Sequence, residues 1–452
     1  MKKIIIENLI SSEKTAVMEN DRLIELIIDN KQSIVSNVYR GIVKKKLDGL
    51  GACFVDIGLE KLAYLKLNKE DTIKNGEEIL VQVNKDEIGD KGCKLNLEVS
   101  ISGRFLVYIP NNYKNTISNK IKKEEDRTRL MNLLESVTDE KGFIIRTESL
   151  NATDEELKKD ICELNIKYQE ITKELKLGIG PKILYKNDSK SIKFIKDNLN
   201  DKYDEIVINS DENRDIIKGI IKDLKLETKL SIIENEDIFN LYKIDSELSK
   251  ALNKKVWLKS GGYLIIEKTE ALTVVDVNSG KFTKGYDLEK TSFKTNYEAS
   301  VEICRQMKLR DIGGIVIVDF IEMKNKENEL EIIKVLNKEI KKDRRTTNVL
   351  GFTKLGLVEI ARRREKESID NYYLEDVECE NSFDYFLDNL EKEVIRIKNH
   401  TSYNKITICI NEKTNHNLKS SSIISDLNKK YEIVINLELD LYSKNNAFKV
   451  KY

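Results

Sequence analysis

Hydrophobic and polar positions change their period several times along the chain, and each change marks a predicted element. Apolar and polar residues alternate over Lys3–Ile6 and Leu23–Ile28, a period of two that predicts a hairpin within residues 1–31. The next stretch predicts short strands separated by Gly and Asp turns: Ser36–Lys45, Ala52–Ile57, Lys61–Leu67, Glu78–Asn84 and Cys93–Ser100. Short strands so closely spaced indicate a small barrel of the oligonucleotide-binding type.

Beyond this barrel the helical and strand periods are mixed, which predicts an α/β architecture with several domains. A strand at Gly142–Thr147 precedes a helix at about 154–176, and strands and helices then alternate through 186–250. The stretch 251–373 is expected to be α/β, and an acidic, mixed segment at 370–383 is expected to be a linker. No internal repeat is visible.

Two apolar runs that lead into aspartates are the strongest chemical signal. Ala271–Asn278 contains Asp276 and Gly313–Phe320 contains Asp319, and both runs predict buried strands of one sheet. Carboxylates are costly to bury unpaired, and two together call for a cation such as Mg²⁺, which prefers oxygen ligands. An aspartate at a strand end also serves as a helix N-cap or a turn former, so the residues alone leave both interpretations open.

Composition limits the classes of function. A chain of 452 residues exceeds one core, and 78 basic against 78 acidic residues neither support nor exclude a polyanionic partner. No apolar run approaches the ~20 residues of a membrane span, and the N-terminus lacks a signal pattern, so a cytoplasmic protein is expected. The six cysteines form no CxxC motif and are expected to be reduced core thiols.

The scarcity of histidine excludes another class. His400 and His416 are the only two, both far from the aspartates, so a hydrolase built on histidine has little material here. Metal and carboxylates must then carry any chemistry. The single tryptophan, Trp257, is expected to pack in the core near a domain junction.

The predicted barrel carries a candidate surface for nucleic acid. Phe54 and Tyr64 are aromatic residues able to stack on bases, and Lys85 and Lys91 lie near them in the sequence and suit phosphates. Phe54 fits equally well as a core residue, and the spacing does not decide between the two.

Longer motifs around the aspartates resemble a known family. The stretches Glu270–Gly280, Thr295-Asn296 and Arg305–Phe320, together with the barrel and Arg146-Thr147, closely resemble the ribonuclease E/G family. Its members are Mg²⁺-dependent, single-strand-specific endoribonucleases of bacteria. The resemblance covers essentially the whole chain and is greatest to the shorter, ribonuclease G type, because the chain stops after the catalytic half without a scaffold extension.

The resemblance implies a multidomain α/β fold with an S1/OB-type β-barrel inserted near the N-terminus. Its implied parts are an RNase H-like subdomain (1–31 and 186–250), the RNA-binding barrel (32–97), a 5′-phosphate sensor (98–185), a DNase I-like α/β catalytic domain (251–373), a linker (374–383) and a small α/β C-terminal domain (384–452).

The resemblance also implies roles for individual residues. Asp276 and Asp319 would ligate the catalytic Mg²⁺, for which Mn²⁺ is a possible substitute, and Asn278 would orient the site. A pocket for the RNA 5′-monophosphate would comprise Gly103, Val107, Arg146 and Thr147, which suits the chemistry of a guanidinium, a hydroxyl and backbone amides. RNA contacts in the barrel would come from Phe54, Tyr64, Lys85 and Lys91.

Two positions depart from the family pattern. Relatives commonly carry a CPxC motif after the catalytic domain, where two subunits share Zn²⁺, but Arg364–Phe383 contains only Cys379. One thiol per chain falls short of the four ligands of a structural zinc site, so no zinc is expected, and a homodimer would need other contacts. Thr346 stands where relatives place a basic residue near the scissile phosphate, and Arg345 is the candidate to replace it.

The implied function is Mg²⁺-dependent cleavage of single-stranded RNA, with a preference for 5′-monophosphorylated substrates. Ribosomal RNA maturation, transfer RNA processing and messenger decay all suit such an enzyme. The alternative is a non-catalytic, ribosome-associated RNA-binding factor that kept the barrel and lost the chemistry; the Asp276–Asn278–Asp319 set argues against it.

Overall fold

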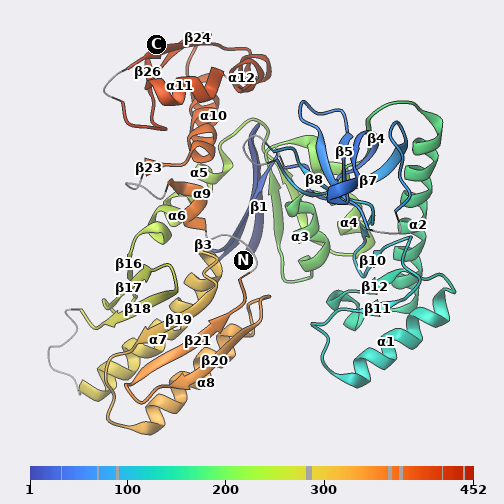
Figure 1. The fold of residues 1–452 in the computed structure, drawn as a ribbon. Helices are drawn as coiled ribbons and strands as arrows, with labels where there is room; N and C mark the ends of the chain where they lie inside the picture. The colour runs from blue at the N-terminus through green and yellow to red at the C-terminus, as the bar shows by residue number, and fades with distance from the viewer. Residues whose placement is uncertain are drawn as a thin grey trace. The chain divides into compact units, whose positions relative to one another are not determined.

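The computed structural model describes the whole chain except residues 32, 69–70, 88–90, 281–287, 365–368, 376–379, 420, 441–442 and 452. The chain forms two compact units, one of residues 31–199 and the other of residues 1–30 together with 200–452 (Figure 1). Each unit has its own hydrophobic cores.

The unit of residues 31–199 begins with a closed five-stranded barrel, as the strand spacing predicts. Its strands are β4 (Val38–Leu47), β5 (Ala52–Asp56), β6 (Ala63–Lys66), β7 (Glu78–Lys85) and β8 (Lys94–Asn96), with a short helix η1 (Asp48–Leu50). The order is β4-β5-β6-β8-β7, the pairing of β4 with β7 closes the ring, and β13 (Lys182–Tyr185) adds to β4. Gly41 is required inside, because a Cβ there would meet a Val55 methyl at 2.5 Å.

The rest of this unit is a small sheet with three helices. The strands are β9 (Ile101–Ser102), β10 (Leu106–Tyr108), β11 (Thr116–Ile117) and β12 (Phe143–Ile145), in the order β11-β12-β10-β9. The helices are α1 (Glu124–Val137), α2 (Asp154–Leu177) and α3 (Lys190–Asn198), with a short η2 (Thr147–Asn151). Helix α2 begins at a capping box in which Thr153 and Glu156 satisfy each other's backbone N–H groups.

The second unit begins with a five-stranded sheet whose strands come from the chain before and after residues 31–199. Its order is β15-β14-β1-β2-β3. The strands are β1 (Lys2–Asn8), β2 (Ser12–Glu19), β3 (Arg22–Asn30), β14 (Glu205–Ile208) and β15 (Lys229–Ile232), accompanied by η3 (Asp211–Asn213), α4 (Arg214–Asp223), α5 (Ile238–Leu241) and α6 (Ile244–Leu252). The first thirty residues therefore form a three-stranded meander and not the simple hairpin expected.

A second sheet in this unit carries the two aspartates. Its order is β16-β17-β18-β19-β21-β20. The strands are β16 (Lys255–Trp257), β17 (Tyr263–Lys268), β18 (Leu272–Asn278), β19 (Gly314–Asp319), β20 (Thr347–Phe352) and β21 (Leu357–Arg362). Helices α7 (Leu288–Leu309) and α8 (Lys326–Ile340) share one hydrophobic core with this sheet (Figure 1).

Among the described residues, helices cover one face of this second sheet and leave the other exposed. Val275 and Val277 of β18 are buried in the core with the helices, whereas Val274, the residue before Val275, is 37% exposed. On β19, Ile315 is 53% exposed although it lies in the same apolar run as the buried Val316. The prediction of buried strands therefore holds for one face of each strand, and the open face carries both apolar side chains and the aspartates.

The C-terminal part comprises α9 (Ile369–Tyr373), a strand pair β22 (Leu374–Glu375) and β23 (Glu380–Asn381), helices α10 (Phe383–His400), α11 (Glu412–Lys419) and α12 (Ile423–Tyr431), and the sheet β25-β24-β26 formed by Val434–Leu439, Lys405–Ile410 and Lys449–Lys451. A fully buried carboxylate, Asp388 of α10, ties this part to β2. It accepts hydrogen bonds from the Ser11 and Ser12 hydroxyls at 2.9 and 2.8 Å and pairs with Lys14 Nζ at 2.5 Å. Burial opposes the charge of Asp388, but Lys14 outweighs it and leaves the pKa lowered.

Two expectations concern absences. Within the described part of the chain, no helix combines the length and apolar character that crossing a membrane requires. Cys379, on which the zinc argument rests, lies outside the described residues, so the absence of a zinc site stays a prediction. The five described cysteines are free thiols.

Candidate functional site

The aspartates lie side by side on neighbouring parallel strands. In the register of β18 with β19, Leu272 is opposite Ile315 and Asp276 is opposite Asp319. Neighbouring strands are ~4.8 Å apart, so the two Cα atoms are about that close. Both side chains alternate with the buried valines and therefore point to the open face, where both are exposed.

Asn278 lies two residues beyond Asp276 and so shares its face of the sheet. Its side-chain amide donates a hydrogen bond to Asp276 Oδ2 at 2.8 Å. The bond fixes the carboxylate of Asp276 in one orientation and leaves Oδ1 available to a further ligand.

The chain segment after Asp319 is held by a buried side chain of α7. Asn296, fully buried, donates to the Ile321 carbonyl at 2.7 Å and accepts from the Ile321 N–H at 3.0 Å. This pair of bonds fixes the direction in which the chain leaves β19. Asn296 belongs to a motif noticed in the sequence, but its role depends on a contact that the sequence does not display.

The carboxylate pair suits a divalent cation. Among the described residues, no lysine or arginine forms an ion pair with Asp276 or Asp319, and no cluster of three His, Cys, Asp or Glu side chains is present. Two uncompensated carboxylates in contact with water match the preference of Mg²⁺ for one or two carboxylates with the remaining positions left to water and phosphate. The residues present therefore fit such an ion.

Arg345 does not lie beside these carboxylates. Its side chain pairs with Asp311, just before β19, and the neighbouring Thr347 is opposite Arg362, which is itself opposite Gly314. Asp319 is at the other end of β19, five residues and roughly 16 Å away. The proposal that Arg345 replaces a basic residue near the scissile phosphate is therefore wrong.

The residues assigned to the 5′-phosphate pocket lie close together around β10 and β12. Arg146 follows β12 directly and donates to the Gly103 carbonyl at 2.7 Å, and Val107 is opposite Ile144. Gly103 has no room for a side chain, because a Cβ would lie 2.4 Å from an oxygen of Asp160. Thr147 begins η2 next to Arg146.

The guanidinium of Arg146 is already engaged. It donates to Asp197 Oδ2 at 2.7 Å and lies 3.5 Å from Glu148. Partial burial opposes the charge of Arg146, but these carboxylates outweigh it and leave its pKa raised. Burial raises the pKa of Asp197 despite its partner. A phosphate would therefore compete with Asp197 for the same guanidinium.

The barrel residues form one row across neighbouring strands. Phe54 is opposite Tyr64, with ring centroids 6.3 Å apart in an edge-to-face arrangement, and both side chains are half-buried. Tyr64 is opposite Lys94, which is opposite Lys85. Lys45 extends the row on the other side of Phe54. Lys45 and Lys94 were missed in the sequence, because their place in the row depends on the register of the closed barrel.

Lys91, the fourth predicted RNA contact of the barrel, is exposed and lies three residues before Lys94. It lies outside the row but on the segment that leads into β8. The structure therefore gathers Phe54, Tyr64 and Lys85 directly and places Lys91 beside them in the chain.

Trp257 differs most from its expectation. It is 64% exposed at the edge strand β16, so its predicted place in the core is wrong. Its ring packs against Tyr263 with centroids 5.4 Å apart, and Lys255 Nζ lies 4.0 Å from the Trp257 ring and 3.7 Å from that of Tyr263.

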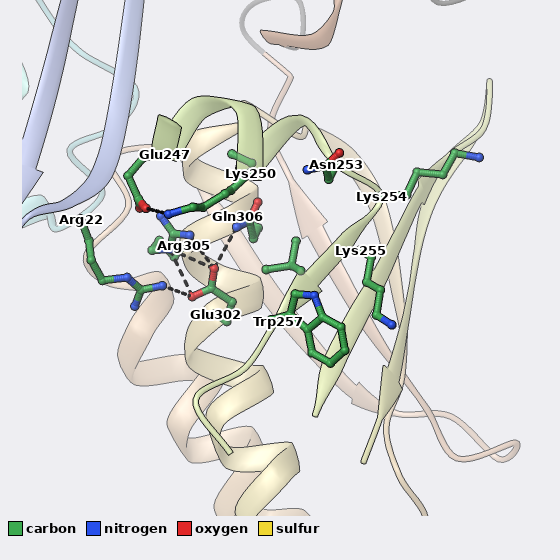
Figure 2. Close-up of a pocket in the computed structure, with 12 residues that line it drawn as sticks. Arg22, Glu247, Lys250, Asn253, Lys254, Lys255, Trp257, Glu302, Arg305 and Gln306 are labelled. Atoms are coloured by element: carbon green, nitrogen blue, oxygen red, sulfur yellow. Dashed lines mark hydrogen bonds and ion pairs between the residues drawn. The ribbon is translucent and has the colours of Figure 1, made fainter. Parts of the chain in front are cut away.

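A pocket of about 410 Å³ adjoins this edge strand. Figure 2 shows Lys255 and Trp257 on one side and an ion-pair cluster on the other, in which Glu302 accepts from Arg22 and Arg305. The pKa of Glu302 is lowered, since these partners outweigh the effect of its burial. The lining contains five lysine or arginine residues and two glutamates, so the pocket has a surplus of positive charge.

Comparisons with known proteins agree with the sequence motifs. The profile of the family described as "Ribonuclease E/G family" matches residues 100–365. The chain is 36% identical to the protein named Ribonuclease G of Haemophilus influenzae over 385 residues, 79% of this chain and 78% of that protein. It is 33% identical to Ribonuclease G of Escherichia coli strain K12 over 80% of this chain and 79% of that protein. It is also 32% identical to Ribonuclease E of Buchnera aphidicola, of which it covers 41%. The chain therefore belongs to the ribonuclease E/G family.

Proposed function

We propose that the chain is a Mg²⁺-dependent endoribonuclease that cleaves single-stranded RNA and favours substrates with a 5′-monophosphate. The observation that carries the proposal is the opposition of Asp276 and Asp319 on one open sheet face. Membership of the ribonuclease E/G family and the names of its relatives support the same activity.

In this proposal Asp276 and Asp319 hold Mg²⁺, or Mn²⁺ in its place. The bound ion would activate water and offset the negative charge that builds on the scissile phosphate. Asn278 would hold the Asp276 carboxylate in a fixed orientation for the ion through its 2.8 Å hydrogen bond. Asn296 keeps Asp319 in place through the chain that follows it. The products are a 5′-phosphate and a 3′-hydroxyl.

The barrel row supplies binding to unpaired bases. Phe54 and Tyr64 offer faces and edges for stacking, and Lys45, Lys85 and Lys94 offer positive charge to the backbone. Each stacked base contributes about 1–3 kcal/mol. Duplex RNA is expected to be a poor substrate because its paired bases are not available to aromatic side chains.

The pocket around Arg146 supplies the preference for the 5′ end. A terminal monophosphate has the charge and oxygen geometry to accept bidentate hydrogen bonds from a guanidinium and to replace Asp197 there. Gly103 and Val107 would line the pocket beside Arg146, and Thr147 would add a hydroxyl. A triphosphate or a 5′-hydroxyl would fit this set less well.

Finer assignments follow from the family resemblance. We propose the RNase H-like, 5′-sensor and DNase I-like identities for the parts named above, a cytoplasmic location, and roles in rRNA and tRNA processing and mRNA decay. A homodimer held without zinc is compatible with the missing CPxC motif.

A cleavage assay tests the proposal. A single-stranded oligoribonucleotide with a 5′-monophosphate should be shortened in Mg²⁺ and remain intact in EDTA. The same sequence with a 5′-hydroxyl should be cleaved more slowly, and the Asp276→Asn variant should bind the RNA without cleaving it. Binding without cleavage by the wild-type protein in Mg²⁺ would instead indicate a non-catalytic RNA-binding factor.

A further inference from the structure

The edge strand β16, two strands from Asp276, exposes an aromatic pair that no contact in the fold requires. Trp257 is 64% exposed. So large an aromatic side chain usually exposes most of its surface to water only at a binding site or interface. Tyr263 packs edge-on against it, and Lys255 places its ammonium over both rings. The three side chains form a preorganised surface, here called the Trp257 platform.

The platform lies on the same face of the sheet as the carboxylates. In the sheet register, Trp257 is opposite Tyr263, and Tyr263 is opposite Asn278, which is bonded to Asp276. Lys255 is in the row of Ile265, Asp276 and Asp319. Two strand spacings separate β16 from β18, so the platform is roughly 10 Å from Asp276. An RNA strand with a phosphodiester at the carboxylates would have a nearby base within reach of it.

The chemistry of the platform matches one ligand. An aromatic face stacks on a nucleobase, and a neighbouring ammonium attracts the phosphate that joins it to the next nucleotide. The adjacent pocket has five cationic and two acidic lining residues, which favours a polyanion over an acidic or neutral protein surface. Its cations are Arg22, Lys250, Lys254, Lys255 and Arg305 (Figure 2).

We propose that Trp257 and Tyr263, with Lys255, bind an unpaired nucleobase of the RNA strand whose phosphodiester lies at Asp276 and Asp319. The inference rests on the proposed ribonuclease function and adds a second base-binding site to that of the barrel row. The platform holds the RNA unpaired next to the cleaved bond. It positions the substrate and does not contact the reacting atoms. Its loss should therefore lower the rate of productive binding and leave the ion site intact.

Fluorescence provides a direct test, because Trp257 is the only tryptophan of the chain. A single-stranded oligoribonucleotide is titrated into the wild-type protein in EDTA, where no cleavage occurs, and the anisotropy of a label on the RNA reports binding in the same sample. Stacking on Trp257 should quench its emission in step with binding. An oligonucleotide with abasic sites should bind through its backbone with little quenching. Unchanged emission at saturating RNA would overturn the proposal.

Variants connect the platform to turnover. Trp257→Ala should lower kcat/KM on single-stranded RNA about 5- to 150-fold, the loss of one base–aromatic stack, whereas Trp257→Phe should retain most of it. Leu350→Ala, which removes another exposed side chain, 67% exposed on the edge strand β20, is the matched control and should cleave as the wild type does. Wild-type rates for Trp257→Ala would refute the platform while leaving the endoribonuclease proposal standing. Absence of Mg²⁺-dependent cleavage by the wild-type protein would refute both.

The fold of the variants is checked separately. Far-UV circular dichroism and Mg²⁺-dependent stabilisation of Trp257→Ala should match those of the wild type, because the ring makes few buried contacts. A variant that is folded and binds Mg²⁺ but is slow with RNA supports the platform. A variant that has lost Mg²⁺-dependent stabilisation would show that Trp257 supports the sheet and would overturn the binding role.

Discussion

Neutralising one member of the carboxylate pair should make the ion-free protein more stable and the enzyme inactive. Asp276 and Asp319 are opposite each other on adjacent strands and have no cationic partner among the described residues. At ~5 Å, two unit charges repel by about 0.8 kcal/mol in bulk water and by about 3 kcal/mol at an effective dielectric constant of 20. Both side chains are exposed, so the lower value applies.

Asp319→Asn is the cleaner perturbation, because Asp276 also accepts the bond from Asn278. We expect this variant to gain about 1 kcal/mol in unfolding free energy in EDTA, the repulsion that it removes. The wild type should gain about 2.7 kcal/mol when Mg²⁺ is raised to 100 times its dissociation constant, and the variant should gain far less. Denaturant unfolding followed by Trp257 fluorescence measures both effects within the sheet that carries the site.

The control is Glu331→Gln, which removes one negative charge from α8, on the other side of the sheet. It should change neither Mg²⁺-dependent stabilisation nor cleavage, because its carboxylate pairs with Lys334 at the surface. If Asp319→Asn cleaves RNA at the wild-type rate, or is stabilised by Mg²⁺ as the wild type is, the two-carboxylate site is wrong. A loss of stability in EDTA would show that the two charges do not repel as the register implies.

Three further outcomes are expected. Asn296→Ala removes both hydrogen bonds that hold the chain after Asp319, so kcat should fall at least tenfold with little change in KM. The control, Ser300→Ala, lies one turn further along α7 and should leave kcat unchanged in the same assay. Arg146→Lys keeps the charge but loses the bidentate geometry, so the ratio of cleavage rates for 5′-monophosphorylated and 5′-hydroxyl RNA should fall towards one. Burial raises the pKa of Glu7 to about 7 despite Lys392 at 3.4 Å, so the stability that Glu7 contributes at low pH should be lost as the pH rises from 4.5 to 7. Glu7→Gln should reduce the difference in unfolding free energy between pH 5 and pH 8, measured by urea unfolding. An unchanged difference would exclude Glu7 as its source.

Much of the architecture follows from local patterns. The barrel was predictable because its strands are short, alternate in polarity and end at Gly and Asp turns. The two aspartates were predictable as strand-end residues, since both follow β-branched runs. Their opposition across β18 and β19 was not predictable from those runs, because it depends on a parallel register spanning the intervening α7.

Other features depend on partners distant in sequence. Strand β2 was overlooked because Ser12, Glu13, Lys14 and Thr15 look like surface residues, yet all four are buried. Lys14 is tolerated there only because Asp388, far along the chain, pairs with it. A period of two cannot reveal such a partner, and the strand therefore lacked its usual hydrophobic signal.

Exposure was the least predictable property of the site. The apolar runs that contain Asp276 and Asp319 predicted buried strands, but in the described residues the helices pack on one face and leave Val274 and Ile315 exposed on the other. Trp257 was assigned to the core on hydrophobicity alone. An edge strand can hold a tryptophan in contact with water when the ring serves recognition, and hydrophobicity does not separate that use from packing.

The insertion of residues 31–199 between β3 and β14 has a consequence for biosynthesis. Strand β1 lies in the middle of its sheet, and its parallel partner begins only at Glu205. At 5–20 residues per second the ribosome takes about 10–40 s to deliver that partner, and the nascent meander meanwhile has an unpaired strand edge. The unit of residues 31–199 can fold within this interval. The inserted middle of the chain therefore folds first, and the sheet of the first thirty residues is completed only when β14 has been synthesised.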